Sequence, residues 1–296
     1  MRVDARQRWA WALAALLLTA LIILAARRLD ATRLFAELAS LHTVWIAVAS
    51  VCYLAILPLW ALQWRLLAPD VERNRFRPML DVVTLTSSTH NTTAFMVGEA
   101  TSVILLVTQI GLARSAALSV LAMDQLLVGV AKLAVLTTAA LAVTLPAWMN
   151  EGMAAVGVGV ILLFGACVLV AARFEAIAAH LAPLKSVRRG GGALALAFAK
   201  KLVEIAAIVC VQHAFGISLP LSSAVVVLGA LNIATLVPIV PGNLGVFEGA
   251  VAVTYTWLGV PAEQAVGMGI VSHACYLAAL ALPGYVVVAR SAVRGS

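Results

Sequence analysis

Residues 238–253 read PIVPGNLGVFEGAVAV, and this stretch decides how the chain folds. It interrupts an otherwise apolar segment with two prolines, three glycines, one asparagine and one glutamate. Proline removes a backbone N–H and resists helix continuation, whereas glycine and asparagine accept left-handed backbone. The stretch therefore predicts a helix that breaks and then resumes with Glu248 in its first turns, where the helix dipole favours an anion. A proline-kinked surface loop with Glu248 as a simple cap is the alternative.

The composition places this break inside a membrane. The chain has 296 residues, of which 63% are hydrophobic and only 11% are charged, against about a quarter charged in soluble domains. Broken backbone survives in hydrocarbon only where protein or a water-filled cavity satisfies its polar groups. The net charge of +7 arises from basic residues placed between apolar segments, which is typical of topology signals and argues against nucleic-acid binding. The four cysteines lie inside apolar segments and show no disulfide or metal spacing.

The apolar runs predict an all-α polytopic membrane protein. Runs long enough for a full transmembrane helix occur at 9–26, 43–64, 116–145, 153–172, 192–214 and 264–289. The remaining stretches, 80–110 and 219–260, are apolar at their ends and broken in the middle. Alternation of arginine-rich and acidic loops predicts that both termini are cytoplasmic and that these two stretches are hairpins entering from opposite faces. The second hairpin could instead be two full spans.

Opposed hairpins predict an inverted repeat within one integral membrane domain, residues 1–296, with halves 1–150 and 151–296. Each hairpin carries one glycine-linked acid: MVGEATS contains Glu99, and GVFEGAV contains Glu248. Broken helices that meet near the midplane are a plan of transporters. The predicted hinge residues are Gly98, Pro238, Pro241, Gly242 and Gly245.

The motif PIVPGNLGVFEGA resembles the Pro-x-x-Pro-Gly-Gly-x-Gly-x-x-Glu signature of the lysylphosphatidylglycerol synthase transmembrane-region family. This flippase-like domain occurs in the multiple peptide resistance factor and in stand-alone membrane proteins, and VGEATSVILL matches its other landmark. The resemblance implies a lipid flippase fold over nearly the whole chain. Four positions depart from the family pattern: Ser102 replaces an arginine, Asp124 and Gln125 replace a Glu-Arg pair, and Asn243 replaces the second glycine. The missing arginines weaken the case for phosphate recognition, since arginine is the natural bidentate partner of phosphate.

Ionisable residues inside apolar segments are candidates for function. Asp124 and Lys132 lie about 12 Å apart on one helix, so each needs a partner elsewhere, and Lys132 is a candidate to replace the missing positive charge. Lys200 and Glu204 are spaced to pair with each other, whereas Lys200 and Lys201 are expected to extend to the membrane surface. His273 is expected to be a hydrogen-bonded packing residue rather than a proton relay. The predicted substrate-binding and translocation residues are His90, Asn91, Glu99, Asp124, Lys132, Asn232, Asn243 and Glu248.

These features favour a transporter that moves a lipid or lipid-linked headgroup between the leaflets of a bacterial cytoplasmic membrane. Glu99, Asp124 and Glu248 are expected to line one cavity, and protonation of Glu99 or Glu248 is the candidate coupling step, because a neutral carboxyl avoids the cost of a buried charge. No cofactor, metal or catalytic residue is assigned, and a homo-oligomer is left open. The alternative is an intramembrane enzyme that acts on a lipid-linked substrate through Glu99 and Glu248.

Overall fold

The computed structural model describes residues 30–69, 75–93, 95–173, 186–236 and 240–295, and every element in these ranges is a helix. The predicted span 9–26 and the predicted hinge Pro238 lie outside the described residues. The helices are α2 (Ala31–Ala39), α3 (Thr43–Leu67), α4 (Phe76–Thr92), α5 (Phe95–Thr108), α6 (Arg114–Ala142), α7 (Ala147–Arg173), α10 (Val187–Ala214), α11 (Leu221–Ala234), the 3-10 turn η1 (Pro241–Asn243), α12 (Val246–Trp257), α13 (Ala262–Leu280) and α14 (Leu282–Gly295). The all-α polytopic prediction is confirmed.

Four helical stretches within the described residues are long and apolar enough to cross a membrane: Thr43–Leu67, Arg114–Ala142, Ala147–Leu169 and Ala262–Arg290. The predicted span at 192–214 is also a single helix, α10, with 28 residues. It falls outside this group of four, and it carries Lys200, Lys201 and Glu204 near its middle. These charges need partners inside the protein, so one face of α10 is turned to the protein interior, while Leu202 on the same helix is exposed.

The predicted span 264–289 is two helices, α13 and α14, which meet at Ala281. Pro283 has no N–H to donate, so backbone carbonyls near this point lose their helical partners. Serines of α4 replace them, because Ser87 Oγ donates to the carbonyl of Leu280 at 2.9 Å and Ser88 Oγ donates to that of Ala281. The break therefore attaches the C-terminal helices to the first hairpin.

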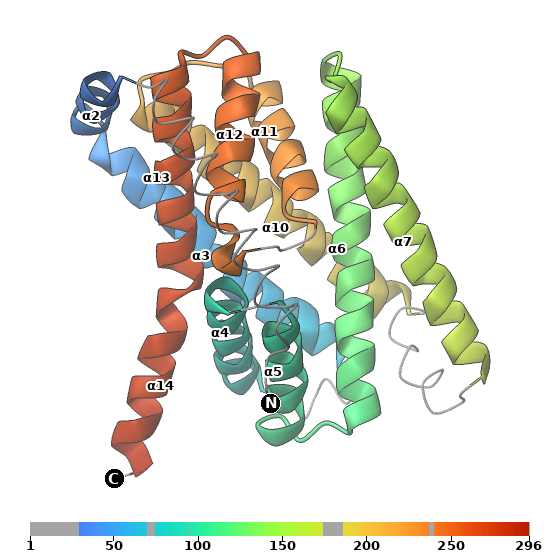
Figure 1. The fold of residues 1–296 in the computed structure, drawn as a ribbon. Coiled ribbons are helices and arrows are strands. Elements are labelled where there is room, and N and C mark those ends of the chain that lie inside the picture. The colour runs from blue at the N-terminus through green and yellow to red at the C-terminus, as the bar shows by residue number, and fades with distance from the viewer. Residues whose placement is uncertain (1–29, 70–74, 94, 174–185, 237–239, 296) are drawn as a thin grey trace, which may run out of the picture.

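The two broken segments form hairpins that meet in the interior. Figure 1 shows α4 and α5 in the lower half of the molecule and α11 and α12 in the upper half, with η1 between them. With 14 and 12 residues, α11 and α12 rise about 21 Å and 18 Å, less than the ~30 Å of a hydrocarbon core. These lengths favour a re-entrant second hairpin over two full spans.

Contact between the hairpin tips depends on a glycine. Gly242 has φ +64°, and a Cβ at this position would lie only 2.7 Å from the backbone oxygen of Asn91. The neighbouring Asn243 is left-handed as well, with φ +53°, as its residue type permits. The tip of each hairpin is thus packed against the backbone of the other.

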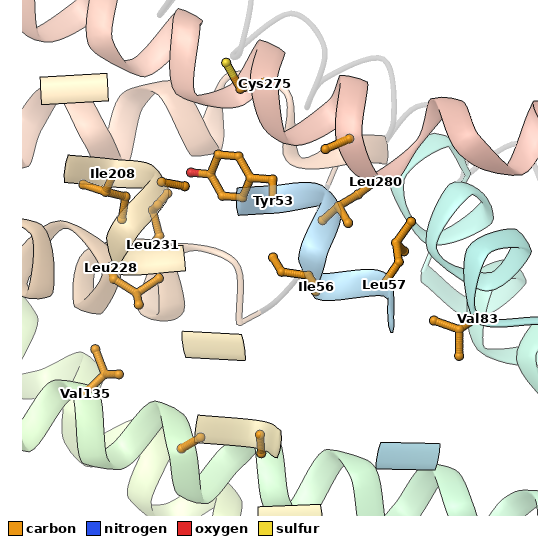
Figure 2. Close-up of a cluster of buried hydrophobic side chains, with 14 of the residues drawn as sticks. Tyr53, Ile56, Leu57, Val83, Val135, Ile208, Leu228, Leu231, Cys275 and Leu280 are labelled. Atoms are coloured by element: carbon orange, nitrogen blue, oxygen red, sulfur yellow. The ribbon is translucent and has the colours of Figure 1, made fainter. Parts of the chain in front are cut away.

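The core that supports the hairpins lies along α3, which packs against α10, α4 and α13. Tyr53, Ile56 and Leu57 of α3 are buried, and they share one hydrophobic cluster with residues of the other helices. Figure 2 shows part of this cluster, with Val83, Val135, Ile208, Leu228, Leu231, Cys275 and Leu280 around them. The hairpins are therefore anchored on a continuous apolar scaffold.

Candidate functional site

A cavity of about 460 Å³ lies between the two hairpins and helices α3, α6, α7 and α10. Its lining contains three carboxylates and three lysines within a chain that is mostly apolar. The histidine, lysine, aspartate and glutamate residues of the lining are His90, Glu99, Asp124, Lys132, Lys200, Lys201 and Glu204. Charged side chains are costly inside a membrane and persist where they pair or contact water. This cavity is the candidate functional site.

Asp124 of α6 pairs with α10 and α3. Its Oδ1 lies 3.8 Å from Lys200 Nζ, and its Oδ2 accepts a hydrogen bond of 3.2 Å from Trp60 Nε1. Lys200 Nζ also lies 5.5 Å from the ring centroid of Trp60, a cation–π geometry. This arrangement corrects two expectations: Lys200 is buried rather than extended to the surface, and its partner is Asp124 rather than Glu204.

Lys201 makes the second charged cluster. Its Nζ donates to Glu204 at 2.8 and 3.1 Å and to Asn232 Oδ1 at 3.3 Å. Because residues three apart share a helix face, it is Lys201 that pairs with Glu204. The expectation that Lys201 reaches the membrane surface is therefore wrong as well, since only 8% of it is exposed. The contact with Asn232 ties α10 to the second hairpin.

Glu99 and Lys132 have weaker or fewer polar contacts with the described residues than the other charged residues of the lining. Glu99 Oε1 accepts a long hydrogen bond of 3.4 Å from Gln125 Nε2 and lies 3.8 Å from His90 Nε2. Lys132 makes no hydrogen bond or ion pair within the described part of the chain. Gln125 and Lys132 are seven residues apart, so they share one face of α6 at a separation of about 10 Å. One face of α6 therefore carries Lys132, which has no ion pair within the described residues, and Gln125, which contacts the weakly held carboxylate of Glu99 on α5.

The tips of the hairpins supply amide groups. Asn91 and Asn243 both line the cavity, and Asn243 Oδ1 is buried without a hydrogen bond within the described residues. Gly98 lies directly against the ring of His90, so a side chain there would overlap it. Together with Asn232, these residues place polar groups from both hairpins around one space.

Glu248 is not among the residues that line the cavity, which corrects the expectation that it joins Glu99 and Asp124 there. Its Oε2 accepts from the N–H of Gly245 at 2.8 Å, half of a capping box, and Gly245 has φ +82°. Its Oε1 lies 2.9 Å from Nδ1 of His273, a buried residue. The carboxylate is thus held by its own helix start and by α13.

Phe247, the neighbour of Glu248, does line the cavity, and its ring stacks on His273 with centroids 4.4 Å apart and an interplanar angle of 9°. Gly269 of α13 allows this packing, since a Cβ there would lie 2.8 Å from the backbone oxygen of Glu248. Glu248 and His273 therefore position Phe247, and with it the motif, at the cavity wall. The expectation that His273 is a hydrogen-bonded packing residue is confirmed.

Comparison with known families identifies the family of the chain. The family model described as "Lysylphosphatidylglycerol synthase TM region" matches residues 11–284, which include both hairpins and the cavity. The chain belongs to this family. The lysylphosphatidylglycerol synthase transmembrane region is a lipid-related membrane domain, so this chain is a multi-pass membrane protein with a lipid-related role. No curated protein and no solved structure gave a significant match.

In this member of the lysylphosphatidylglycerol synthase transmembrane-region family, sequence reasoning missed Trp60, Gln125 and Glu204 as lining residues. A signal existed for Glu204, because three charges within five residues of an apolar helix require a polar interior partner. Trp60 carried no such signal, since tryptophan in an apolar span is usually a packing residue. Its role follows only from the approach of α3 to Asp124.

Proposed function

We propose that this protein moves a lipid with a polar headgroup between the two leaflets of a membrane. The observation that carries the proposal is a polar cavity placed between the tips of two broken hairpins in an otherwise apolar chain. A headgroup that crosses a bilayer needs polar partners along its route, because hydrocarbon offers none. The cavity supplies them, while the surrounding helices present apolar side chains to the bilayer.

The charges of the residues that line the cavity indicate which kind of headgroup it can bind. Three carboxylates (Glu99, Asp124, Glu204) and three lysines (Lys132, Lys200, Lys201) line the cavity, so their formal charges sum to zero when all are ionised. Among these six side chains, Asp124 pairs with Lys200 and Glu204 pairs with Lys201, so Lys132 is the lysine of this lining that has no ion pair within the described residues. An ammonium binds phosphate as a point charge. Lys132 is therefore the candidate partner of a headgroup phosphate in place of the arginines that the family commonly has.

Transport is a better match to this geometry than catalysis through Glu99 and Glu248. Such an enzyme would need both carboxylates to reach one substrate, whereas Glu248 is bound to Gly245 and His273 and does not line the cavity. Glu99, with the weaker contacts of the two acids, is then the candidate for proton coupling. We place the protein in a bacterial cytoplasmic membrane with both termini in the cytoplasm.

The test is lipid translocation in proteoliposomes that contain unlabelled phosphatidylethanolamine and phosphatidylglycerol. Membrane-impermeant reagents modify the amine or the diol of these lipids only in the outer leaflet, so the appearance of inner-leaflet lipid outside reports transport. We expect transport by the wild-type protein and its loss in Lys132→Gln and Glu99→Gln. The matched controls Arg114→Gln and Glu151→Gln change exposed residues outside the cavity and should transport normally. Translocation at the wild-type rate in all four variants would refute the proposed function.

A further inference from the structure

A second concavity, of about 340 Å³, lies beside the polar cavity and is apolar throughout. Its walls include Leu127 and Val130 of α6, Ile161 and Phe164 of α7, and Leu194 of α10. Every residue of its lining is leucine, isoleucine, valine or phenylalanine. This apolar groove therefore offers neither hydrogen bonds nor charge to an occupant.

The apolar groove and the polar cavity share a wall. Val160 lines both, and on α6 Gly129 lines the cavity while its neighbour Val130 lines the groove. A Cβ on Gly129 would lie 2.7 Å from Cγ2 of Val160. The two helices thus approach as closely as a glycine allows. A glycine–valine contact forms part of the boundary between a charged space and an apolar one.

The groove is accessible from the bilayer. Figure 1 shows α7 at the edge of the molecule beside α6, and α7 packs mainly against α6 and α11. Ile161 and Phe164 contribute to the groove although 70% and 57% of each residue is exposed. In a membrane-spanning helix, exposed side chains of this type face lipid. A lipid can therefore reach the groove sideways, along α7.

We propose that the apolar groove seats an acyl chain of the same lipid whose headgroup occupies the polar cavity. This inference rests on the proposed function and adds a binding site to it. A lipid joins a polar headgroup to apolar acyl chains, and in this protein the polar cavity and the apolar groove adjoin at Val160. Lipid tails are as apolar as the groove, so no hydrophobic gain accompanies entry. The groove consequently contributes shape selection and orientation of the substrate rather than affinity.

Filling the groove tests the inference. Ile161→Trp and Leu127→Trp add bulk to its walls, while Leu162→Trp adds the same bulk to an exposed position of α7 outside the groove. With the leaflet assay above, we expect the two groove variants to slow translocation about tenfold, equivalent to ~1.4 kcal/mol of activation free energy. The control should match wild type. Groove variants that transport at the wild-type rate would overturn the acyl-chain site, whereas the proposed function would fail only if the Lys132 and Glu99 variants were unaffected.

Photolabelling supplies an independent readout that does not depend on turnover. Wild-type protein is reconstituted with phosphatidylethanolamine and phosphatidylglycerol that carry a diazirine in one acyl chain, and adducts are mapped by mass spectrometry. We expect adducts on Phe164 that are competed by unlabelled phospholipid but not by diacylglycerol, which lacks the headgroup. Adducts on Leu169, an exposed residue outside the groove, serve as the reference for bulk lipid. Equal competition by diacylglycerol at Phe164 would mean that the groove holds bulk lipid only, and the inference would be wrong.

Discussion

Removal of one partner from the Asp124–Lys200 pair should destabilise the protein far more than removal of both. The two side chains are 5% and 8% exposed, and they lie 3.8 Å apart. Asp124→Asn leaves a buried ammonium without its counter-ion, and Lys200→Gln leaves a buried carboxylate. Breaking a buried pair in this way costs about 3–5 kcal/mol. Because the pair borders the cavity, where water can reach it, we expect values at the lower end, about 3 kcal/mol for each single variant.

The double variant should recover much of this loss, because neither charge then remains unpaired. Because the two single costs add to about 6 kcal/mol and the double variant should cost well under 3 kcal/mol, a coupling free energy of more than about 3 kcal/mol between the two positions is expected. Trp60→Phe is a separate probe. It removes the hydrogen bond to Asp124 Oδ2 and shrinks the ring that faces Lys200, and it should cost about 1.5–3 kcal/mol.

The measurement is unfolding by sodium dodecyl sulfate in mixed micelles, followed by circular dichroism, for the wild type, both single variants and the double variant. Arg114→Gln and Glu151→Gln serve as controls at exposed positions and should remain within about 0.5 kcal/mol of wild type. If the double variant loses as much stability as the two single variants added together, the residues act independently and the argument for a paired Asp124 fails.

Three further predictions concern the hairpins and the topology. Gly242→Ala should destabilise the protein by about 1–3 kcal/mol, because position 242 has a positive φ and a Cβ there would approach the backbone oxygen of Asn91. Gly165→Ala is the control in the same unfolding assay: a Cβ at position 165 has no neighbour within 4 Å, so no destabilisation is expected. His273→Ala should slow lipid translocation at unchanged protein levels because it releases Glu248; a wild-type rate would show that the contact is dispensable. A cysteine at position 114 should react only with reagents added from the cytoplasmic side, and labelling from outside would contradict the assigned topology.

Much of the fold was predictable because membrane helices follow from apolar length alone. The predicted spans 43–64, 116–145 and 153–172 correspond to α3, α6 and α7, with ends displaced by six residues or fewer. The broken segments were also evident, since proline, glycine and asparagine have intrinsic backbone effects that tertiary packing cannot hide. The break at Ala281 was missed although Pro283 marks it in the sequence; the serines that satisfy the freed carbonyls, Ser87 and Ser88, lie far away in sequence and could not be predicted from it.

The candidate site was less predictable, because pairing depends on which helix faces which. The sequence marks Asp124 as a charge that needs a partner on another helix. For Lys200 it allowed either a pair with Glu204 or, together with Lys201, extension to the membrane surface, because spacing within one helix does not decide between these arrangements. The observed choice follows from the approach of α6 and α3 to α10, which brings Asp124 to Lys200.

The glutamate of the second hairpin, Glu248, belongs to the motif but does not line the cavity. Glu248 Oε2 accepts a hydrogen bond from the Gly245 N–H, and Glu248 Oε1 is hydrogen-bonded to His273 Nδ1, so each carboxylate oxygen has a partner. His273 Nε2 is buried without a hydrogen bond within the described residues, so a proton on that nitrogen would lack an acceptor. The arrangement therefore favours the tautomer that donates from Nδ1 to Glu248. The ring is then free to stack on Phe247, which reaches the cavity wall. In the proposed transporter, movement of the second hairpin must either carry α13 with it or break this contact, so the Glu248–His273 pair is where rearrangement of the hairpin tip would be resisted.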